Sequence, residues 1–376
     1  MLRGLHQAIS LGCALLVSLS CSETRTYNSG DYDSFAASKD LSVSDAEAED
    51  ILNQILSRYE NGEDLGPAVK ALLQVLSSQL SDKNPWLGLT ISEANRQQIA
   101  ERRSLYLSSA DTALDQYGFV EGCDGLLFSS LGVVGGLDID LSQAESQVEP
   151  GRWYRSAGQD CFDTGRSESS ISRDMLIGLA VALLQAQDLS AVERIIAYAE
   201  DNNGIIGEAS NREDQFGRAF MTPSLEAIYH ELRFRLGGID SDRRGYIPDL
   251  TKGQRGFKAH LQGLGMLLRV QFYGGLFAQD VEILQELANS QDRNSLFLAL
   301  YGGLTDGDGD AAASALLDTE IFPSDRLPSS EDRCEPYIWQ RDQDGDDWQP
   351  CLEKDLIHPA ADFLFVSALL LGELDL

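Results

Sequence analysis

The chain has 376 residues and a formal net charge of −31, with 60 Asp and Glu side chains against 29 Lys and Arg. A surface this negative repels phosphate backbones, so the composition excludes nucleic acid as a partner. Anionic membrane surfaces are repelled for the same reason, and residence at a membrane therefore needs a dedicated anchor.

The N-terminal segment has the pattern of an export signal. Arg3 is followed by residues 5–20, which contain no Asp, Glu, Lys or Arg and are too short and interrupted for a membrane span. The segment ends in Val17-Ser18-Leu19-Ser20-Cys21, which resembles the lipobox of bacterial lipoprotein precursors, with Ser18 in place of the usual Leu. The resemblance implies a signal peptide over residues 1–20, lipidation of Cys21 and, from the Ser that follows, sorting to an outer membrane. The alternative is an ordinary secretory signal cleaved nearby.

Cysteine usage agrees with export. Cys13 would leave with the signal and Cys21 would carry lipid, which leaves four: Cys123, Cys161, Cys334 and Cys351. An even number outside the cytosol favours disulfides. Among the three connectivities, we expect neighbours to pair, Cys123 with Cys161 and Cys334 with Cys351. No Cys-x-x-Cys pair occurs, which disfavours a zinc site.

The rest of the N-terminal part divides into a tether and the start of a helical domain. Residues 21–42 are mostly Ser, Asp, Tyr, Asn and Gly and predict a flexible tether. The domain, residues 43–376, opens with the capping box Ser44-x-x-Glu47 and apolar residues at helical spacing. Further helices are predicted over residues 66–80 and 92–117.

Residues 118–170 interrupt the helical pattern with Gly, Asp, Trp and Cys in irregular order. Long ordered loops are often functional, and one closed by a Cys123–Cys161 bridge would hold a fixed shape. The alternative is a surface excursion held by the disulfide.

From residue 170 onward, helix starts with polar first turns alternate with almost wholly apolar bodies. A helix that is apolar all round must be buried on all sides. The sequence therefore predicts an all-α fold, a helical-hairpin array or (α/α) toroid with long disulfide-stapled loops. This architecture resembles the (α/α) toroids of certain glycosidases and polysaccharide lyases, without a family motif. Residues 171–175 and 333–351 also resemble uncharacterised envelope lipoproteins, which implies no activity.

If the helix starts meet at one rim, they bring together groups suited to acid–base cleavage of a glycosidic bond. Asp174 and Asp362 would be the catalytic pair, with His260 or His358 assisting. The substrate-binding candidates are Arg155, Arg173, Trp153, Tyr154 and Glu226. The alternative is that Ser172 and Asp174 cap a helix and that the histidines are structural.

An acidic cluster near the C-terminus predicts a calcium site, and calcium is the one cofactor that the sequence favours. Asp342, Asp344 and Asp346 are followed by Glu353 at position 12, as in an EF-hand loop. Position 6 is Asp347 rather than Gly, and Pro350 intrudes, so the alternative is a hydrated acidic turn. No P-loop, dinucleotide fingerprint, Gly-x-Ser-x-Gly elbow or zinc-protease motif occurs, so no cofactor is required.

Two functions follow from these patterns. The first is a lipid-anchored, exported envelope protein with a non-catalytic binding or structural role, whose partner is a polysaccharide or another envelope protein. The alternative is a glycan-processing hydrolase or lyase with its carboxylate and histidine site at the rim of the toroid. The choice depends on whether the polar first turns of the buried helices share one opening.

Overall fold

The computed structural model describes residues 89–120, 122–210, 217–238, 246, 250–273, 275–276, 278–305, 307–333, 337 and 356–374. The chain divides into two compact units, Met1–Asp82 and Lys83–Leu376, and all described residues belong to the second. The signal peptide, the tether and the helices predicted before residue 81 lie outside the described residues. None of the helices described is long and apolar enough to cross a membrane.

The described part of the chain is mostly helical, as the sequence predicts, and its one sheet has two strands. The helices are α5 (Glu93–Ser109), α6 (Gly125–Val134), α7 (Asp160–Asp163), α8 (Arg173–Ala186), α9 (Leu189–Asp201), α10 (Pro223–Arg235), α11 (Gly256–Tyr273), α12 (Ala278–Ser290), α13 (Ser295–Leu304), α14 (Asp310–Leu316) and α15 (Ala361–Leu371). Short 3-10 helices cover η2 (Ala110–Ala113) and η3 (Leu141–Ala144). The strands are β1 (Ile205–Glu208) and β2 (Arg218–Phe220), which pair antiparallel.

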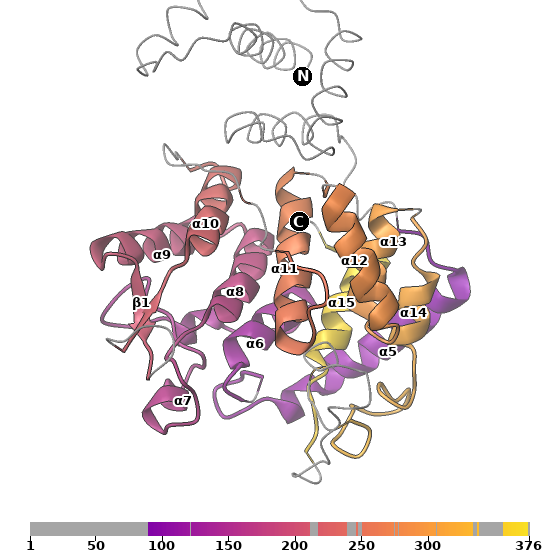
Figure 1. The fold of residues 1–376 in the computed structure, drawn as a ribbon. Helices are drawn as coiled ribbons and strands as arrows, with labels where there is room; N and C mark the ends of the chain where they lie inside the picture. Colours follow the sequence, from indigo (N-terminus) through magenta and orange to yellow (C-terminus); the bar gives the residue numbers. More distant parts are fainter. Residues whose placement is uncertain are drawn as a thin grey trace, which may run out of the picture. The chain divides into compact units, whose positions relative to one another are not determined.

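The core is organised around α6, which packs against α8 on one side and α15 on the other. Nine of the ten residues of α6 are buried, as are the first ten residues of α15, Ala361–Leu370. Figure 1 shows α9 and α10 beyond α8, and α12, α13 and α14 on the far side of α11. The burial of α15 agrees with its almost wholly apolar sequence, whereas α9 is amphipathic and buries one face.

Small residues permit the close approach of α6 to its neighbours. A methyl group added at Gly178 of α8 would lie 3.2 Å from the Cα of Leu127, and one added at Gly135 would lie 2.6 Å from the backbone of Leu364. Larger side chains at these positions would force the backbones apart. The glycines in the apolar bodies therefore serve helix packing.

Polar side chains at the helix starts define several boundaries. Asp188 accepts a hydrogen bond from Ala191 N at 2.9 Å, Thr222 from Leu225 N, and Asn294 from Phe297 N, each in the N-cap position. Such caps satisfy backbone N–H groups that have no partner within the helix.

Two predicted boundaries are wrong. The helix expected over residues 92–117 ends at Ser109, because hydroxyl groups such as Ser108 Oγ and Thr112 Oγ1 bond to nearby carbonyls and compete with the helical pattern. The second error is larger, since the irregular region 118–170 contains α6, of which nine of the ten residues are buried. Its apolar run has no helical periodicity to reveal it.

Candidate functional site

The predicted catalytic pair, Asp174 and Asp362, is not brought together, and α6 shows why. Asp174 lies close enough to Arg155 for the charge of Arg155 to act on it. The loop that carries Arg155 contacts the first turn of α6, where Leu126 N donates to Arg155 O at 2.7 Å. The start of α15 contacts the last turn, since a methyl added at Gly132 would lie 3.4 Å from Ala361 Cβ. These two contact points are six residues apart, about 9 Å along the helix axis, so the two carboxyl groups belong to opposite ends of α6.

Asp362 is held in a closed ion pair. Both of its oxygens contact the guanidinium of Arg333, at 2.5 and 3.2 Å, and Oδ1 also accepts a hydrogen bond from Phe363 N at 2.9 Å. The side chain of Asp362 is fully buried, and Arg333 lies over the ring of Phe322 at 4.9 Å. A carboxylate enclosed in this way cannot reach a substrate, so its role is structural.

The two candidate histidines are also enclosed. His260 is fully buried and stacks on Phe128 with ring centroids 5.8 Å apart, and burial lowers its pKa to about 3. His358 is 1% exposed, and burial, helped by the charge of Arg333, lowers its pKa to about 4. Both rings are therefore neutral at physiological pH and belong to the core.

Asp174 lies in the first turn of α8 and is 3% exposed. The predicted cap is not formed, because Ser172 occupies the N-cap position but its hydroxyl donates to the Asp174 carboxylate rather than accepting from the backbone. Burial raises the pKa of Asp174, and the charge of Asp124 adds to the rise; the Ser172 bond and the charge of Arg155 oppose it.

The remaining substrate-binding candidates scatter. Arg173 is exposed at the start of α8. Glu226, in the first turn of α10, lies 3.8 Å from His230 Nε2. Trp153 is only 4% exposed and forms part of the core, so it offers no stacking platform. Tyr154 and Arg155, by contrast, line a cavity.

A hairpin between residues 144 and 154 positions this cavity. Tyr154 N donates to Ala144 O at 2.9 Å, and Glu145 pairs with Trp153 in an antiparallel bridge. Glu145 also accepts two hydrogen bonds from the Arg194 guanidinium of α9, both at 2.7 Å, and one from Gly151 N at 2.7 Å. Burial raises the pKa of Glu145, but these bonds outweigh it and leave the pKa lowered. The hairpin is thereby fixed on α9.

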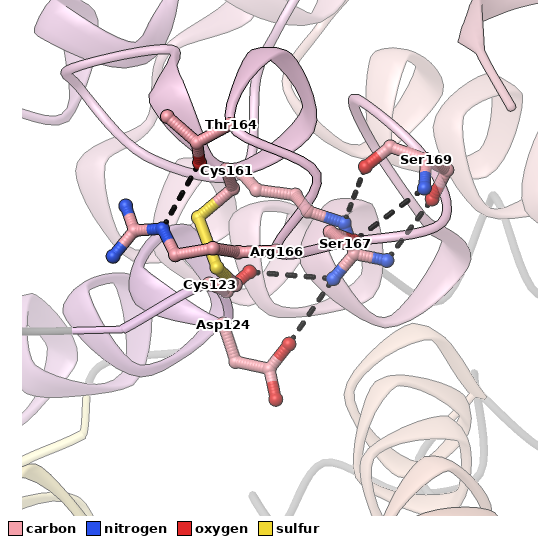
Figure 2. Close-up of a disulfide and its surroundings, with 8 residues drawn as sticks. Cys123, Asp124, Cys161, Thr164, Arg166, Ser167 and Ser169 are labelled. Carbon is pink, nitrogen blue, oxygen red and sulfur yellow. Dashed lines mark hydrogen bonds and ion pairs between the residues drawn. A yellow bond between two sulfur atoms is a disulfide. The ribbon is translucent and has the colours of Figure 1, made fainter. Parts of the chain in front are cut away.

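Arg155 connects the hairpin to the predicted Cys123–Cys161 disulfide, which the structure contains with a Cα–Cα distance of 5.5 Å. Nη1 of Arg155 donates to Cys123 O at 3.3 Å and lies 3.1 Å from Asp124 Oδ1. Nε donates to Ser169 O at 2.8 Å, and Nη2 to Ser169 Oγ at 3.0 Å. Figure 2 shows the disulfide beside these acceptors. One guanidinium thus joins three segments at the start of α6.

The cavity has a volume of about 180 Å³ and lies between the hairpin, α7 and β1. It is lined chiefly by polar and aromatic side chains, among them Arg152, Tyr154, Arg155, Gln159, Phe162 and Glu208. Cys161 also faces it, so the disulfide forms part of its wall.

Arg152 and Glu208, which carry opposite charges, are paired with each other at the cavity. Arg152 contacts Glu208 through Nη2 and Glu149 through Nη1, and its guanidinium lies 4.9 Å from the centre of the Tyr154 ring. Burial raises the pKa of Glu208, but hydrogen bonds from Ser170 and Arg152 outweigh it and leave the pKa lowered. Burial raises the pKa of Tyr154, so its hydroxyl stays protonated and able to donate.

Most residues around the cavity were missed by sequence reasoning. Glu208, for example, arrives on a four-residue strand whose apolar pattern is too short to place it. Gln159 was also missed, although its backbone has φ of 54°, a left-handed conformation that non-glycine residues rarely adopt. Such strain concentrates at functional sites, but it is visible only in the structure.

Several predicted sites cannot be placed. Cys21, the Cys334–Cys351 pair and the calcium candidates Asp342, Asp344, Asp346 and Glu353 lie outside the described residues. Within the described ranges, no group of three or more His, Cys, Asp or Glu side chains is arranged to hold a metal ion. Asp310, at the start of α14, accepts hydrogen bonds through Oδ1 from Ser92 N and Asn95 Nδ2, which fixes α14 to the start of α5.

Comparison of the chain with protein-family models, with curated proteins and with solved structures finds no match. The geometry of the cavity and the sequence patterns are therefore the observations that point to a function.

Proposed function

We propose that this chain is an exported, lipid-anchored envelope protein with a binding role, and that the cavity beside the Cys123–Cys161 disulfide receives its ligand. The observation that carries the binding role is the set of fixed hydrogen-bonding groups around that cavity, positioned by the Arg155 and Arg152 networks. A small number of convergent polar groups in a preformed hollow is typical of ligand sites.

The lipid anchor at Cys21 and the outer-membrane location are supported by the lipobox-like sequence and by the acidic surface, which needs an anchor. Growing bacteria with an alkynyl fatty acid tests this proposal, because a lipidated chain becomes labelled. We expect Cys21→Ser to abolish labelling and Cys13→Ser to leave it unchanged. Labelling that survives Cys21→Ser would refute the anchor.

For the architecture, we propose a helical-hairpin array that closes toward an (α/α) toroid. Neighbouring helices in the sequence pack side by side, as α8 does with α9, α12 with α13, and α13 with α14. This is the contact pattern that hairpin repeats produce. An experimental structure in which the hairpins do not follow one another around a common axis would contradict the toroid.

A glycan-processing activity remains the second candidate, favoured by one observation. The buried Asp174 has a raised pKa and lies in the field of a second carboxylate, Asp124, which is paired with Arg155. Two carboxyl groups in unequal environments are the starting point for acid–base chemistry. Asp362 takes no part in this version of the hypothesis.

One experiment separates the two candidates. The full chain, purified in detergent, is titrated calorimetrically with mono- and oligosaccharides, amino acids and small anions, and is incubated with a polysaccharide panel. The binding role predicts saturable binding of at least one compound and no cleavage products. Cleavage that Asp174→Asn abolishes would establish the enzyme instead, and an absence of both binding and cleavage would refute the proposal.

A further inference from the structure

We propose that the cavity between the hairpin, α7 and β1 takes a neutral, polyhydroxylated ligand of monosaccharide size. The inference rests on the proposed binding function and adds the chemical class of the ligand. It follows from the volume of the cavity, the balance of charge on its walls and the donors and acceptors that its residues present.

The volume limits the size of the ligand. The cavity measures about 180 Å³, whereas pockets that receive drug-sized ligands measure about 300–1,000 Å³. It is nevertheless far larger than the ~15 Å³ that a single ordered water requires. A single sugar ring or an amino acid fits this range, and a longer oligosaccharide or a peptide would have to extend beyond the cavity.

The charges on the walls disfavour a ligand with a net charge. The lining contains the guanidinium groups of Arg152 and Arg155 and the carboxyl groups of Asp163 and Glu208, so that its charges cancel. Each arginine is already ion-paired, Arg152 with Glu208 and Arg155 with Asp124. An anion would compete with these carboxylates and would also be repelled by the net charge of −31.

The polar groups that remain available suit hydroxyl groups. A guanidinium has five N–H donors, and the hydrogen bonds of Arg155 use four, which leaves one Nη2 N–H without an acceptor among the described residues. Tyr154 and the amide of Gln159 also line the cavity. A hydroxyl group both donates and accepts, so a ligand with several hydroxyls matches this mixture of donors and acceptors.

The cavity also has an apolar surface and a strained residue. Phe162, partly exposed at the end of α7, offers a ring face against which the C–H groups of a sugar ring can pack. Gln159 holds its side chain at the cavity from a left-handed backbone with φ of 54°. The amide of Gln159 supplies both a hydrogen-bond donor and an acceptor. Backbone strain of this kind clusters at ligand sites, and here it lies at the wall of the cavity.

The test titrates the full chain in detergent with three sets of probes: neutral monosaccharides, amino acids, and the anions phosphate, sulfate and a uronic acid. We expect one-to-one binding of a neutral monosaccharide, with Kd raised at least tenfold by Gln159→Ala. Gln187→Ala is the matched control, because Gln187 has the same φ of 54° but caps the end of α8. It should leave Kd unchanged, and circular dichroism of both variants should match the parent.

A second pair of variants tests whether Gln159→Ala acts through the backbone conformation rather than through loss of a ligand contact. Phe162→Ala should also weaken binding at least tenfold, while Phe234→Ala, at an exposed position of α10, should not. If an amino acid or an anion binds and Gln159→Ala weakens it, the sugar class is refuted while the binding function stands. If a sugar binds and neither cavity variant weakens it, the cavity is refuted as the site. If nothing binds, both the sugar class and the binding function fail.

Discussion

Arg333 and Asp362 form a two-point ion pair at the start of α15, with N···O distances of 2.5 and 3.2 Å and side chains that are only 7% and 0% exposed. Removal of one member of a buried pair typically costs about 3–5 kcal/mol, because the other charge loses its partner in the interior. We therefore expect Arg333→Gln to lower the free energy of unfolding by that amount, measured by urea denaturation at pH 7.

The matched control is Arg293→Gln. Arg293 also contacts a carboxylate, Asp318 at 2.6 Å, but its side chain is 48% exposed. Exposed pairs contribute at most about 1 kcal/mol, so this variant should lose little stability. If both substitutions cost the same, the ion pair is not a structural element of the core, and Asp362 would again be a candidate for chemistry.

The disulfide should contribute to both stability and binding. It closes a segment with a sequence separation of 38 residues, for which chain-entropy models give about 4 kcal/mol. We expect the double variant Cys123→Ser/Cys161→Ser to lose stability of that order in urea titrations. Because Cys161 lines the cavity, the same variant should bind the monosaccharide at least tenfold more weakly.

The double variant leaves Cys334 and Cys351 in place, so it isolates one bridge, whereas reduction with dithiothreitol would act on every disulfide present. Dithiothreitol added to the double variant therefore serves as the control for effects at other cysteines. Full binding by the double variant would show that the cavity wall keeps its shape without the bridge.

Stability should fall as the pH is lowered from 6.5 to 4, because of two buried histidines. Burial lowers the pKa of His260 to about 3 and that of His358 to about 4, from 6.5 in the unfolded chain. The unfolded state then binds more protons in this window, so the free energy of unfolding rises with pH there. Each histidine contributes a slope of up to about 1.4 kcal/mol per pH unit.

The variant His260→Phe tests this pH dependence, since phenylalanine retains an aromatic ring against Phe128 but does not titrate. Urea titrations at pH 7, 6, 5 and 4.5 should give a shallower slope for the variant than for the parent. Carboxyl groups with lowered pKa, such as those of Glu145 and Glu208, contribute only near and below their usual value of 4.5. Parallel curves for parent and variant would contradict the assignment.

Sequence reasoning predicted the helical class but not the location of the candidate site, and particular residues explain the difference. Helices with a polar first turn and a long apolar body, such as α8 and α15, have a recognisable start and length. The apolar run of α6 is short, and its periodicity does not distinguish a helix from a strand. Without α6 at the centre, the polar helix starts were expected to meet at one rim.

The candidate site itself depends on contacts between segments far apart in the sequence. Arg155 and Tyr154 were identified as binding residues because of their chemistry, and both line the cavity. Glu208 reaches the same cavity through the Arg152 ion pair, 56 residues away in sequence, and no local pattern predicts such a contact. The pairing of Cys161 with Cys123, by contrast, followed from cysteine parity and neighbour pairing.

The turn of the hairpin leaves no room for a side chain at residue 151. Gly151 has φ of +87°, and a methyl group added to it would lie 2.0 Å from the carbonyl oxygen of Arg194, a backbone atom of α9 that cannot easily move. Gly151→Ala should therefore destabilise the protein well beyond the ~1–2 kcal/mol that a left-handed backbone alone imposes on alanine.

Gly165→Ala is the control, because Gly165 has φ of +73° with nothing within 4 Å of the added methyl. Urea titrations should show a loss of about 1–2 kcal/mol for Gly165→Ala and a clearly larger one for Gly151→Ala, with weakened ligand binding only in the latter. Equal losses would mean that the hairpin can move away from α9 without cost, and that the Glu145–Arg194 contacts do not position the cavity.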